Sequence, residues 1–373
     1  IMAYTNIDDP SAYFQTKLYT GSNANQSITN DGNSDLQPDF IFASYRTLPP
    51  YTNHRAIIDS SRGRAEILES DTTAAEATTT LPAYDLVSFD TNGFTVGPVN
   101  STSALNASGI SHVAWQWKAN GGTTTSKSST TIDTNVTTPC VQQVNTDAGI
   151  SIITYTASTS YAGTETHLEH GLGAGPRFLM VKRRDTAADW AVYHADNGGS
   201  PNAGYSYNVL NSSAATAQSS PTNKYWLNTP AESNATLLAF GLENGADGGE
   251  YVCYAFAEKQ GYSKFGKYVG NGSTDGPFVY TGFKPALIIT KNADATDSWN
   301  LLDNKRSPYN AADKYLQADN ATAEGTYTFY DILSNGFKIR NTGNANISGN
   351  NILYIAFAEN PFVTSTGIPT TAR

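Results

Sequence analysis

The stretch "YVCYAFAEKQGYSKFG" at residues 251–266 has a near copy in "ILYIAFAENPF" at residues 352–362. A more distant copy, "HVAWQWKA", has Trp117 at the position that Phe256 and Phe357 occupy in the other two. A recurring stretch predicts that one structural unit recurs, so internal repeats are the first feature to establish. If the copies are real, they define the architecture of the chain.

Other landmarks recur in the same order upstream of each copy. A proline precedes an apolar run at Pro38 in "QPDFIFASYR", at Pro176 in "GPRFLMVKRRD" and at Pro285 in "KPALIITKNAD". Trp190 in "DWAVYHAD" and Trp299 in "SWNLLDNK" follow their prolines at the same distance. Because spacing and large residues both match, we interpret the chain as three copies of one unit.

The repeats predict the domain boundaries. The copies cover roughly residues 14–120, 150–260 and 264–363, and residues 121–149 are rich in Gly, Ser and Thr. The predicted domains are repeat 1 with an N-terminal arm (1–120), a linker (121–149), repeat 2 (150–263), and repeat 3 with a C-terminal tail (264–373).

Each copy consists of short apolar runs rich in β-branched and aromatic residues and bounded by Gly, Pro, Asn or Asp. This pattern is typical of strands, and the Asn-Gly pairs before Phe94 and Phe337 indicate hairpins. The predicted fold is all-β, with three tandem β-sandwich repeats of jelly-roll or lectin-like type. Only "NAADKYLQA" (310–318) is expected to form one or two helical turns. Trp190 and Trp299 are expected in the core.

Composition narrows the function classes. The formal net charge of -10 argues against a nucleic-acid partner that is bound through phosphates. "KRRD" at residues 182–185 is interpreted as a solvated strand end. No apolar run approaches the ~20 residues of a membrane helix, and the N-terminal residues do not resemble a signal peptide, so no membrane partner is expected. Cys140 and Cys253 are expected to be unpaired, with Cys253 buried.

The sequence suggests no catalytic, cofactor-binding or metal-binding residues. The most metal-like spot is "HLEHGLG", where His167 and His170 flank Glu169, but the other copies lack it. A solvated or capping role is the favoured interpretation. Acidic residues do not recur at matched positions, apart from Asp59 and Asp303. A glycosidase stays open, because its two carboxylates can lie far apart in the sequence.

Several stretches carry a family resemblance: "YAFAEKQGYSKFGKYVGNGSTDGPFVYTGFKPALIITKN", "DILSNGFKIRNTG" and the opening "MAYTNIDDPSAYFQTKLYTGSNANQSITNDGNSDLQPDF". They resemble tandem-repeat virion proteins of marine tailed bacteriophages, built from a β-rich domain of unknown function and often described as structural or tail-fibre-like. The likeness covers almost the whole chain. It departs in the first copy, where "RTLPPYTNHR" (46–55) replaces a shorter hairpin.

The resemblance implies a virion location and a non-enzymatic role as a tail fibre, appendage or capsid decoration. It further implies other virion proteins and host surface glycans as partners and, by analogy with fibres, a homo-oligomer. Two alternatives stay open. One is a carbohydrate-binding adhesin whose repeats give avidity through multivalency, and the other is a polysaccharide depolymerase.

Overall fold

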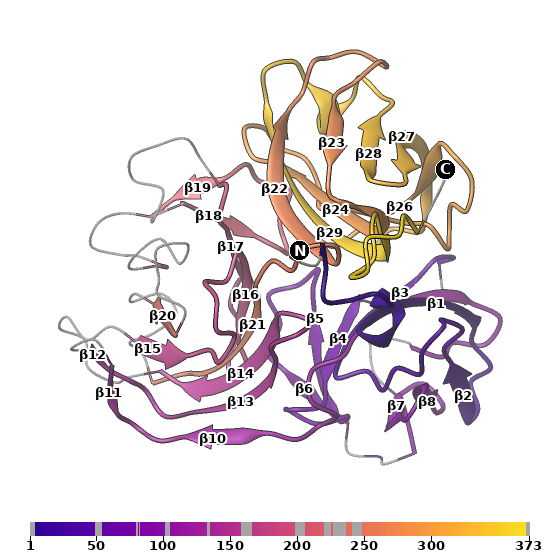
Figure 1. Ribbon diagram of the computed structural model, residues 1–373. Helices are drawn as coiled ribbons and strands as arrows, with labels where there is room; N and C mark the ends of the chain where they lie inside the picture. Colours follow the sequence, from indigo (N-terminus) through magenta and orange to yellow (C-terminus); the bar gives the residue numbers. More distant parts are fainter. Residues whose placement is uncertain are drawn as a thin grey trace.

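The computed structural model describes residues 4–48, 54–79, 81, 83–100, 105–132, 135–157, 166–197, 206–219, 225–226, 236–240 and 248–370. Within these residues the regular structure is strand, apart from the short 3-10 helices η1 (Pro10–Ala12) and η3 (Asn344–Asn346). The all-β prediction is therefore confirmed. Figure 1 shows three strand-rich lobes arranged around a common centre.

The first lobe contains a six-stranded sheet, called here the first sheet, and a smaller one of three strands. Ile28 and Phe94 of the smaller sheet pack with Ile41 and Ile58 of the first sheet in one buried cluster. The first sheet has the order β1 (Phe14–Thr20), β9 (Ser111–Trp117), β3 (Phe40–Tyr45), β4 (Ala56–Asp59), β5 (Glu66–Glu69), β6 (Ala77–Thr78), and the smaller sheet β2 (Gln26–Thr29), β8 (Gly93–Val96), β7 (Leu86–Asp90).

The second sheet has eight strands. Leu168 and Leu238 of a two-stranded sheet share a buried cluster with Leu179 of the second sheet. The second sheet has the order β10 (Thr125–Lys127), β13 (Cys140–Asn145), β14 (Ile150–Thr156), β21 (Glu250–Phe256), β16 (Phe178–Arg183), β17 (Ala191–His194), β18 (Ser206–Val209), β19 (Ala217–Gln218); the small pairs are β15 (Thr166–Glu169) with β20 (Leu237–Phe240), and β11 (Thr131–Ile132) with β12 (Asn135–Val136).

The third sheet also has eight strands. It folds over its own buried cluster, which includes Phe337 on one strand and Ile288 on another. The order is β22 (Ser263–Val269), β29 (Asn351–Pro361), β24 (Phe283–Asn292), β25 (Asn300–Asp303), β26 (Ala312–Gln317), β27 (Gly325–Leu333), β28 (Gly336–Ile339), β23 (Phe278–Tyr280).

The three large sheets share one strand order over six strands. The lead-in strands β1, β14 and β22 each pair with the late aromatic strands β9, β21 and β29, which in turn pair with β3, β16 and β24. The register also agrees, because Trp117 lies opposite Phe40, Phe256 opposite Phe178, and Phe357 opposite Leu287. The landmarks matched in the sequence therefore occupy matching positions in the sheets.

Both Asn-Gly hairpins are present. Asp90 pairs with Gly93, and Leu333 pairs with Gly336, so two residues connect the strands in each case. Gly93 has a φ of 106°, and a Cβ there would lie 2.0 Å from the carbonyl oxygen of Ile28. Glycine is required at this position by its conformation and by the close approach of the neighbouring strand.

The central core joins all three sheets. Trp117, Phe256 and Phe357 meet there, with ring centroids 6.3 Å apart for Trp117 and Phe256, 5.3 Å for Trp117 and Phe357, and 5.8 Å for Phe256 and Phe357. All three are buried, as are Trp190 and Trp299, so the prediction of core residues is confirmed. Such aromatic pairs add about 0.5–1.5 kcal/mol beyond the area that they bury.

Two segments differ from the expectation drawn from the sequence. The prediction of helical turns at residues 310–318 is wrong, because β26 occupies most of them and pairs with both β25 and β27. Pairing on both edges outweighs a local helical preference. The segment expected to be a linker, 121–149, contributes β10 and β13 to the second sheet. The domain boundaries themselves stay a prediction.

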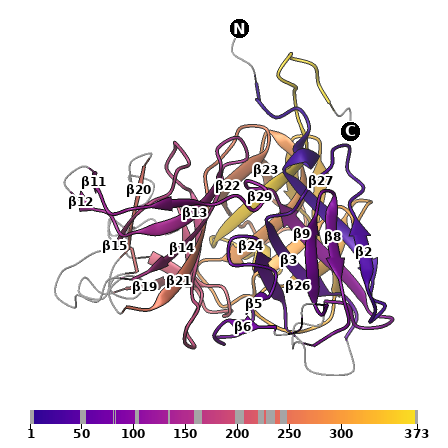
Figure 2. The ribbon, with the colours of Figure 1, turned by 90° about the horizontal axis from the view of Figure 1, so that it is seen from below.

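The described ends of the chain lie at the same end of the molecule (Figure 2). Asp8 near the start accepts hydrogen bonds of 2.6 Å from the backbone N–H and the hydroxyl of Ser365 near the end. Tyr4 also reaches the third lobe, where its hydroxyl donates to the carbonyl of Gly282 at 2.9 Å. The N-terminal arm therefore fastens the first lobe to the third.

Candidate functional site

The metal-like spot of the sequence lies on β15 and the turn that follows. His167 and His170 are buried, and the backbone N–H of Leu172 donates to Nδ1 of His170 at 3.2 Å. Glu169 forms an ion pair of 3.2 Å with Lys127. A solvated role is therefore wrong for both histidines, whereas the bond from Leu172 is a capping contact. Nowhere in the described residues do three or more His, Cys, Asp or Glu side chains gather closely enough to hold a metal ion.

Both cysteines are free, and Cys253 is buried, as the sequence predicted; Cys140 is buried as well. Burial raises the pKa of the Cys140 thiol to about 11 and that of Cys253 further still. Both thiols are protonated at neutral pH, which disfavours nucleophilic chemistry because the thiolate is the reactive form.

The two aspartates that recur in the sequence lie at matching positions in two sheets. Asp59 ends β4 and Asp303 ends β25, and each accepts a bond of 2.8 Å from the backbone N–H of an arginine three residues later, Arg62 or Arg306. The same arginine donates from Nε to the carboxylate at 2.5 Å, and both side chains of each pair are fully buried. Each Asp-x-x-Arg turn thus builds a buried ion pair.

Each buried pair is also bonded by a ring from a neighbouring sheet. The hydroxyl of Tyr254 in the second sheet donates to Asp59 at 2.7 Å, and Nε1 of Trp115 in the first sheet donates to Asp303 at 3.1 Å. Tyr254 and Trp115 occupy matching positions, opposite Met180 and Phe42. Burial raises the pKa of Tyr254 well above its ordinary value, so its hydroxyl remains a donor.

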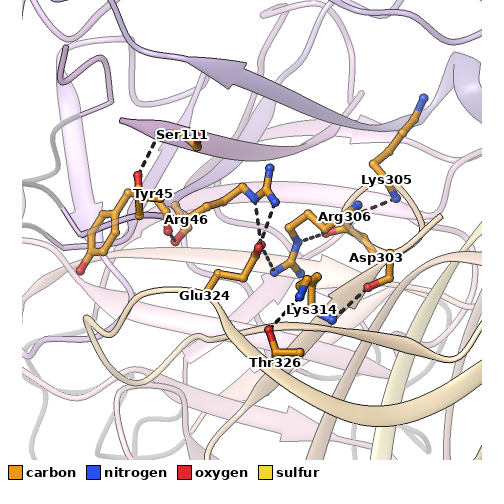
Figure 3. Close-up of polar contacts among 12 residues, drawn as sticks. Tyr45, Arg46, Ser111, Asp303, Lys305, Arg306, Lys314, Glu324 and Thr326 are labelled. Carbon is orange, nitrogen blue, oxygen red and sulfur yellow. Dashed lines mark hydrogen bonds and ion pairs between the residues drawn. The ribbon is translucent and has the colours of Figure 1, made fainter. Parts of the chain in front are cut away.

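A glutamate extends each pair across an interface. Glu324 accepts two bonds from Arg46 of the first sheet, at 2.8 and 2.9 Å, and lies 3.4 Å from Arg306 (Figure 3). Glu76 likewise lies between Arg62, at 2.5 Å, and Arg184 of the second sheet, at 2.6 Å.

Burial by itself would raise the pKa of Glu76, but the bonds and charges of Arg184 and Arg62 lower it overall. Its carboxylate is therefore ionised at neutral pH and accepts bonds from both guanidinium groups.

The third interface, between the second and third sheets, has different chemistry. His194 stands opposite Phe178, in the position of Asp59 and Asp303. Its Nε2–H donates to the carbonyl of Tyr354 at 3.1 Å, and its Nδ1 accepts the backbone N–H of Asp196 at 3.2 Å. These bonds require neutral imidazole, and burial lowers the pKa of His194 to about 4.

A cyclic set of contacts connects the three sheets. Trp190 of the second sheet donates from Nε1 to the carbonyl of Glu69 in the first at 2.7 Å, and Trp299 of the third donates to Val209 in the second at 2.9 Å. Arg55 closes the cycle by donating from Nε to the carbonyl of Gln317 in the third sheet. The acceptors match in register, since Glu69, Val209 and Gln317 pair with the first residues of β4, β17 and β25.

Backbone hydrogen bonds connect the same three pairs of sheets, with the donor and acceptor sheets exchanged. The N–H of Glu76 donates to the carbonyl of Arg184, that of Thr216 to Ala293, and that of Glu324 to Arg46, each at 2.9 Å. Each of the three interfaces therefore has a backbone hydrogen bond between corresponding residues, although the side chains near that bond differ.

Buried lysines add donors at two of the interfaces. Lys182 donates to the carbonyl of Thr73 in the first lobe at 3.0 Å, and Lys291 donates to that of Ser213 in the second lobe at 3.1 Å. Burial lowers the pKa of both to about 8. The interpretation of residues 182–185 as a solvated strand end is therefore wrong for Lys182, and Arg184 binds Glu76.

Reasoning from the sequence found Asp59 and Asp303 but missed the charged partners around them. Arg62, Arg306, Glu76 and Glu324 were not singled out. A usable signal was present, because "DSSR" and "DNKR" both place an arginine three residues after the matched aspartate. The glutamates also lie in matching stretches, "TAAEA" (73–77) and "ATAEG" (321–325), so the expectation that only Asp59 and Asp303 recur among acidic residues is wrong. Their partners Arg184 and Arg46 come from other sheets and have no local signal.

The fold and these contacts define an all-β protein whose sheets are joined by buried ion pairs and by reciprocal backbone contacts. The chain belongs to the family described as Domain of unknown function (DUF7483), whose model matches residues 9–361. The search of curated proteins found no match. Among the described residues, no helix combines the length and apolar character needed to cross a bilayer.

Proposed function

We propose that this protein is a structural component of a bacteriophage virion, displayed on the particle surface as a tail fibre, an appendage or a capsid decoration. We further propose that the chain is three tandem copies of one β-sandwich unit, with a role in presenting surface rather than in catalysis. The resemblance noted in the sequence motivates the viral setting, and the geometry of the interfaces supports the mechanical role.

The observation that carries the proposal is the cyclic set of interface contacts. Trp190, Trp299 and Arg55 each donate from one sheet to the corresponding backbone carbonyl of the next. Contacts of this kind give one relative placement of the three lobes, because a shift at one interface would strain the other two. A body held in this way suits a protein that bears load and displays loops in fixed positions.

The distribution of charge supports the same role. Asp59, Asp303 and their arginines are fully buried and bonded to each other and to neighbouring sheets. Breaking a buried ion pair leaves an uncompensated charge, so such pairs strongly penalise misassembly. These buried ion pairs thus help to maintain the assembly of the three sheets.

The test is whether the protein belongs to intact particles. Virions of the phage whose genome encodes the chain would be purified on a density gradient, and the protein quantified by mass spectrometry against the major capsid protein. A constant copy number per particle is expected. A protein confined to the particle-free lysate would contradict the proposal.

A second assay separates the alternatives. Host surface polysaccharide is incubated with purified protein, and new reducing ends are measured together with binding. Binding without turnover favours the adhesin-like alternative, which is compatible with a place on the virion. Turnover would favour a depolymerase and overturn the non-enzymatic part of the proposal.

A further inference from the structure

A pocket of about 370 Å³ lies on the third lobe, where β25, β26 and β27 face the turn containing η3. This volume is within the range of small-molecule sites, in which a few placed polar groups give orientation beside apolar and aromatic surface. Tyr315, Tyr327 and Phe329 supply the rings, and Asp297 and Asn344 are among the polar groups.

The rings form a supported aromatic wall. Phe329 contacts Tyr315 with centroids 5.3 Å apart and Tyr327 with centroids 5.2 Å apart. Tyr315 lies against Gly325, its partner in the strand pairing, where a Cβ would be 2.3 Å from the ring. Tyr327 is 45% exposed, so part of its ring is available to a ligand. The aromatic surface is thus held in place by the strand beneath it.

The polar side is a chain of planar groups joined by long hydrogen bonds. Asn344 donates to one carboxylate oxygen of Asp297 at 3.2 Å, and Asn300 donates to the other at 3.3 Å. Gln317 donates to Asn300 at 3.4 Å. Bonds of this length are at the weak end of the accepted range, so ligand hydroxyls can replace them at little cost.

The side chains that line the pocket carry little charge. Asp297 is the only acidic or basic side chain among them, and burial raises the pKa of that carboxyl. Lys314 donates to the hydroxyl of Thr326, one of the lining residues, at 2.8 Å (Figure 3). An aromatic wall opposite amide groups, without a free cation, is suited to a ligand with one apolar face and many hydroxyls.

We propose that this pocket is a glycan-binding site that accepts a neutral pyranose unit, stacked on Tyr327 and hydrogen-bonded to the exposed amide of Asn344, while the buried Asn300, which also donates to the carbonyl of Ser298 at 3.1 Å, supports Asp297 from below. The identity of the natural ligand, a host surface polysaccharide, rests on the proposed function of presenting surface on a virion. The binding chemistry itself depends only on the pocket.

The test uses the full chain and defined probes. Maltotetraose, cellotetraose and laminaritetraose represent neutral glycans, and sialyllactose represents an anionic one. Saturation-transfer NMR detects binding, and isothermal titration measures affinity. Tyr327→Ala is the diagnostic variant and Tyr309→Ala the matched control, because Tyr309 is 84% exposed but does not line the pocket. Thermal unfolding checks that both variants fold.

At least one neutral tetrasaccharide is expected to bind at millimolar concentration, with Tyr327→Ala weakening it about tenfold and Tyr309→Ala leaving it unchanged. Absence of binding to every neutral probe, equal loss in both variants, or preference for sialyllactose would each overturn the inference. Incorporation into particles is measured in a separate experiment. The virion proposal can therefore fail while the pocket binds a glycan, and the pocket can fail to bind while the protein is found in virions.

Discussion

At two interfaces of this protein a buried Asp–Arg ion pair lies at one position of the sheet, and at the third interface a neutral histidine occupies the corresponding position. Asp59 and Asp303 anchor the ionic interfaces, whereas His194 occupies the corresponding position between the second and third sheets. Backbone and aromatic contacts recur at all three. The difference shows that strand register and the shared core set the relative placement of the sheets. The residue type at the position of Asp59, Asp303 and His194 can vary without changing that placement.

The largest effect is expected from removing one partner of an ionic interface. Asp303→Ala would leave Arg306 buried without its carboxylate, which costs roughly 3–5 kcal/mol of unfolding free energy. Urea unfolding measures the loss. Lys305→Ala is the control, because its ion pair with Asp31 is exposed and should change stability by less than about 1 kcal/mol. Equal effects of the two variants would contradict the ranking of buried over exposed pairs.

A comparable effect is expected in the core that all three interfaces share. Phe357→Ala removes a ring that contacts both Trp117 and Phe256, and such truncations cost about 3–5 kcal/mol. Phe256→Ala should cost a similar amount, because it occupies the same position. Phe278→Ala is the control, since Phe278 is 46% exposed. An unchanged melting temperature in Phe357→Ala would show that the core is not common to the three sheets.

Acid should weaken the histidine interface. Burial lowers the pKa of His194 from 6.5 to about 4, so the folded state favours the neutral ring. Its contribution is complete above pH 6.5 and is lost as the pH falls toward 4, by roughly 3 kcal/mol.

The measurement is urea unfolding at several pH values for the wild type and for His194→Gln. His112 is also buried with a pKa lowered to about 4, so the variant should still lose stability in acid, but less than the wild type by the part that is due to His194. An identical pH dependence of the two proteins would show that His194 is not the sensitive group.

The smallest effect is expected from single donors in the cycle. Trp299→Phe and Trp190→Phe keep an aromatic ring but remove the Nε1–H that bonds the next sheet. Leaving a buried carbonyl unpaired costs about 1–3 kcal/mol, and the two variants should agree because their contacts correspond. Differential scanning calorimetry would compare them. A large difference between the two would break the proposed equivalence of the interfaces.

Part of the fold was predictable because it depends on local chemistry. Short β-branched and aromatic runs bounded by turn residues indicate strands, and Asn-Gly pairs indicate hairpins, because both signals act within a few residues. The correspondence of Trp117, Phe256 and Phe357 was likewise visible in the sequence. The contact of these three rings in one core could not be predicted, because a match between copies gives no information on how the copies pack against each other.

The sequence by itself determined the all-β class, the recurrence of matched landmarks along the chain and the burial of the large aromatic residues, because turn residues and apolar volume are properties of short segments. Only the tertiary structure decided that residues 312–317 are a strand, that Lys182 is buried, and that Glu76 and Glu324 pair with arginines of other sheets. These outcomes depend on partners far away in the chain. Pairing and desolvation energies arise only when those partners meet, so no local pattern encodes them.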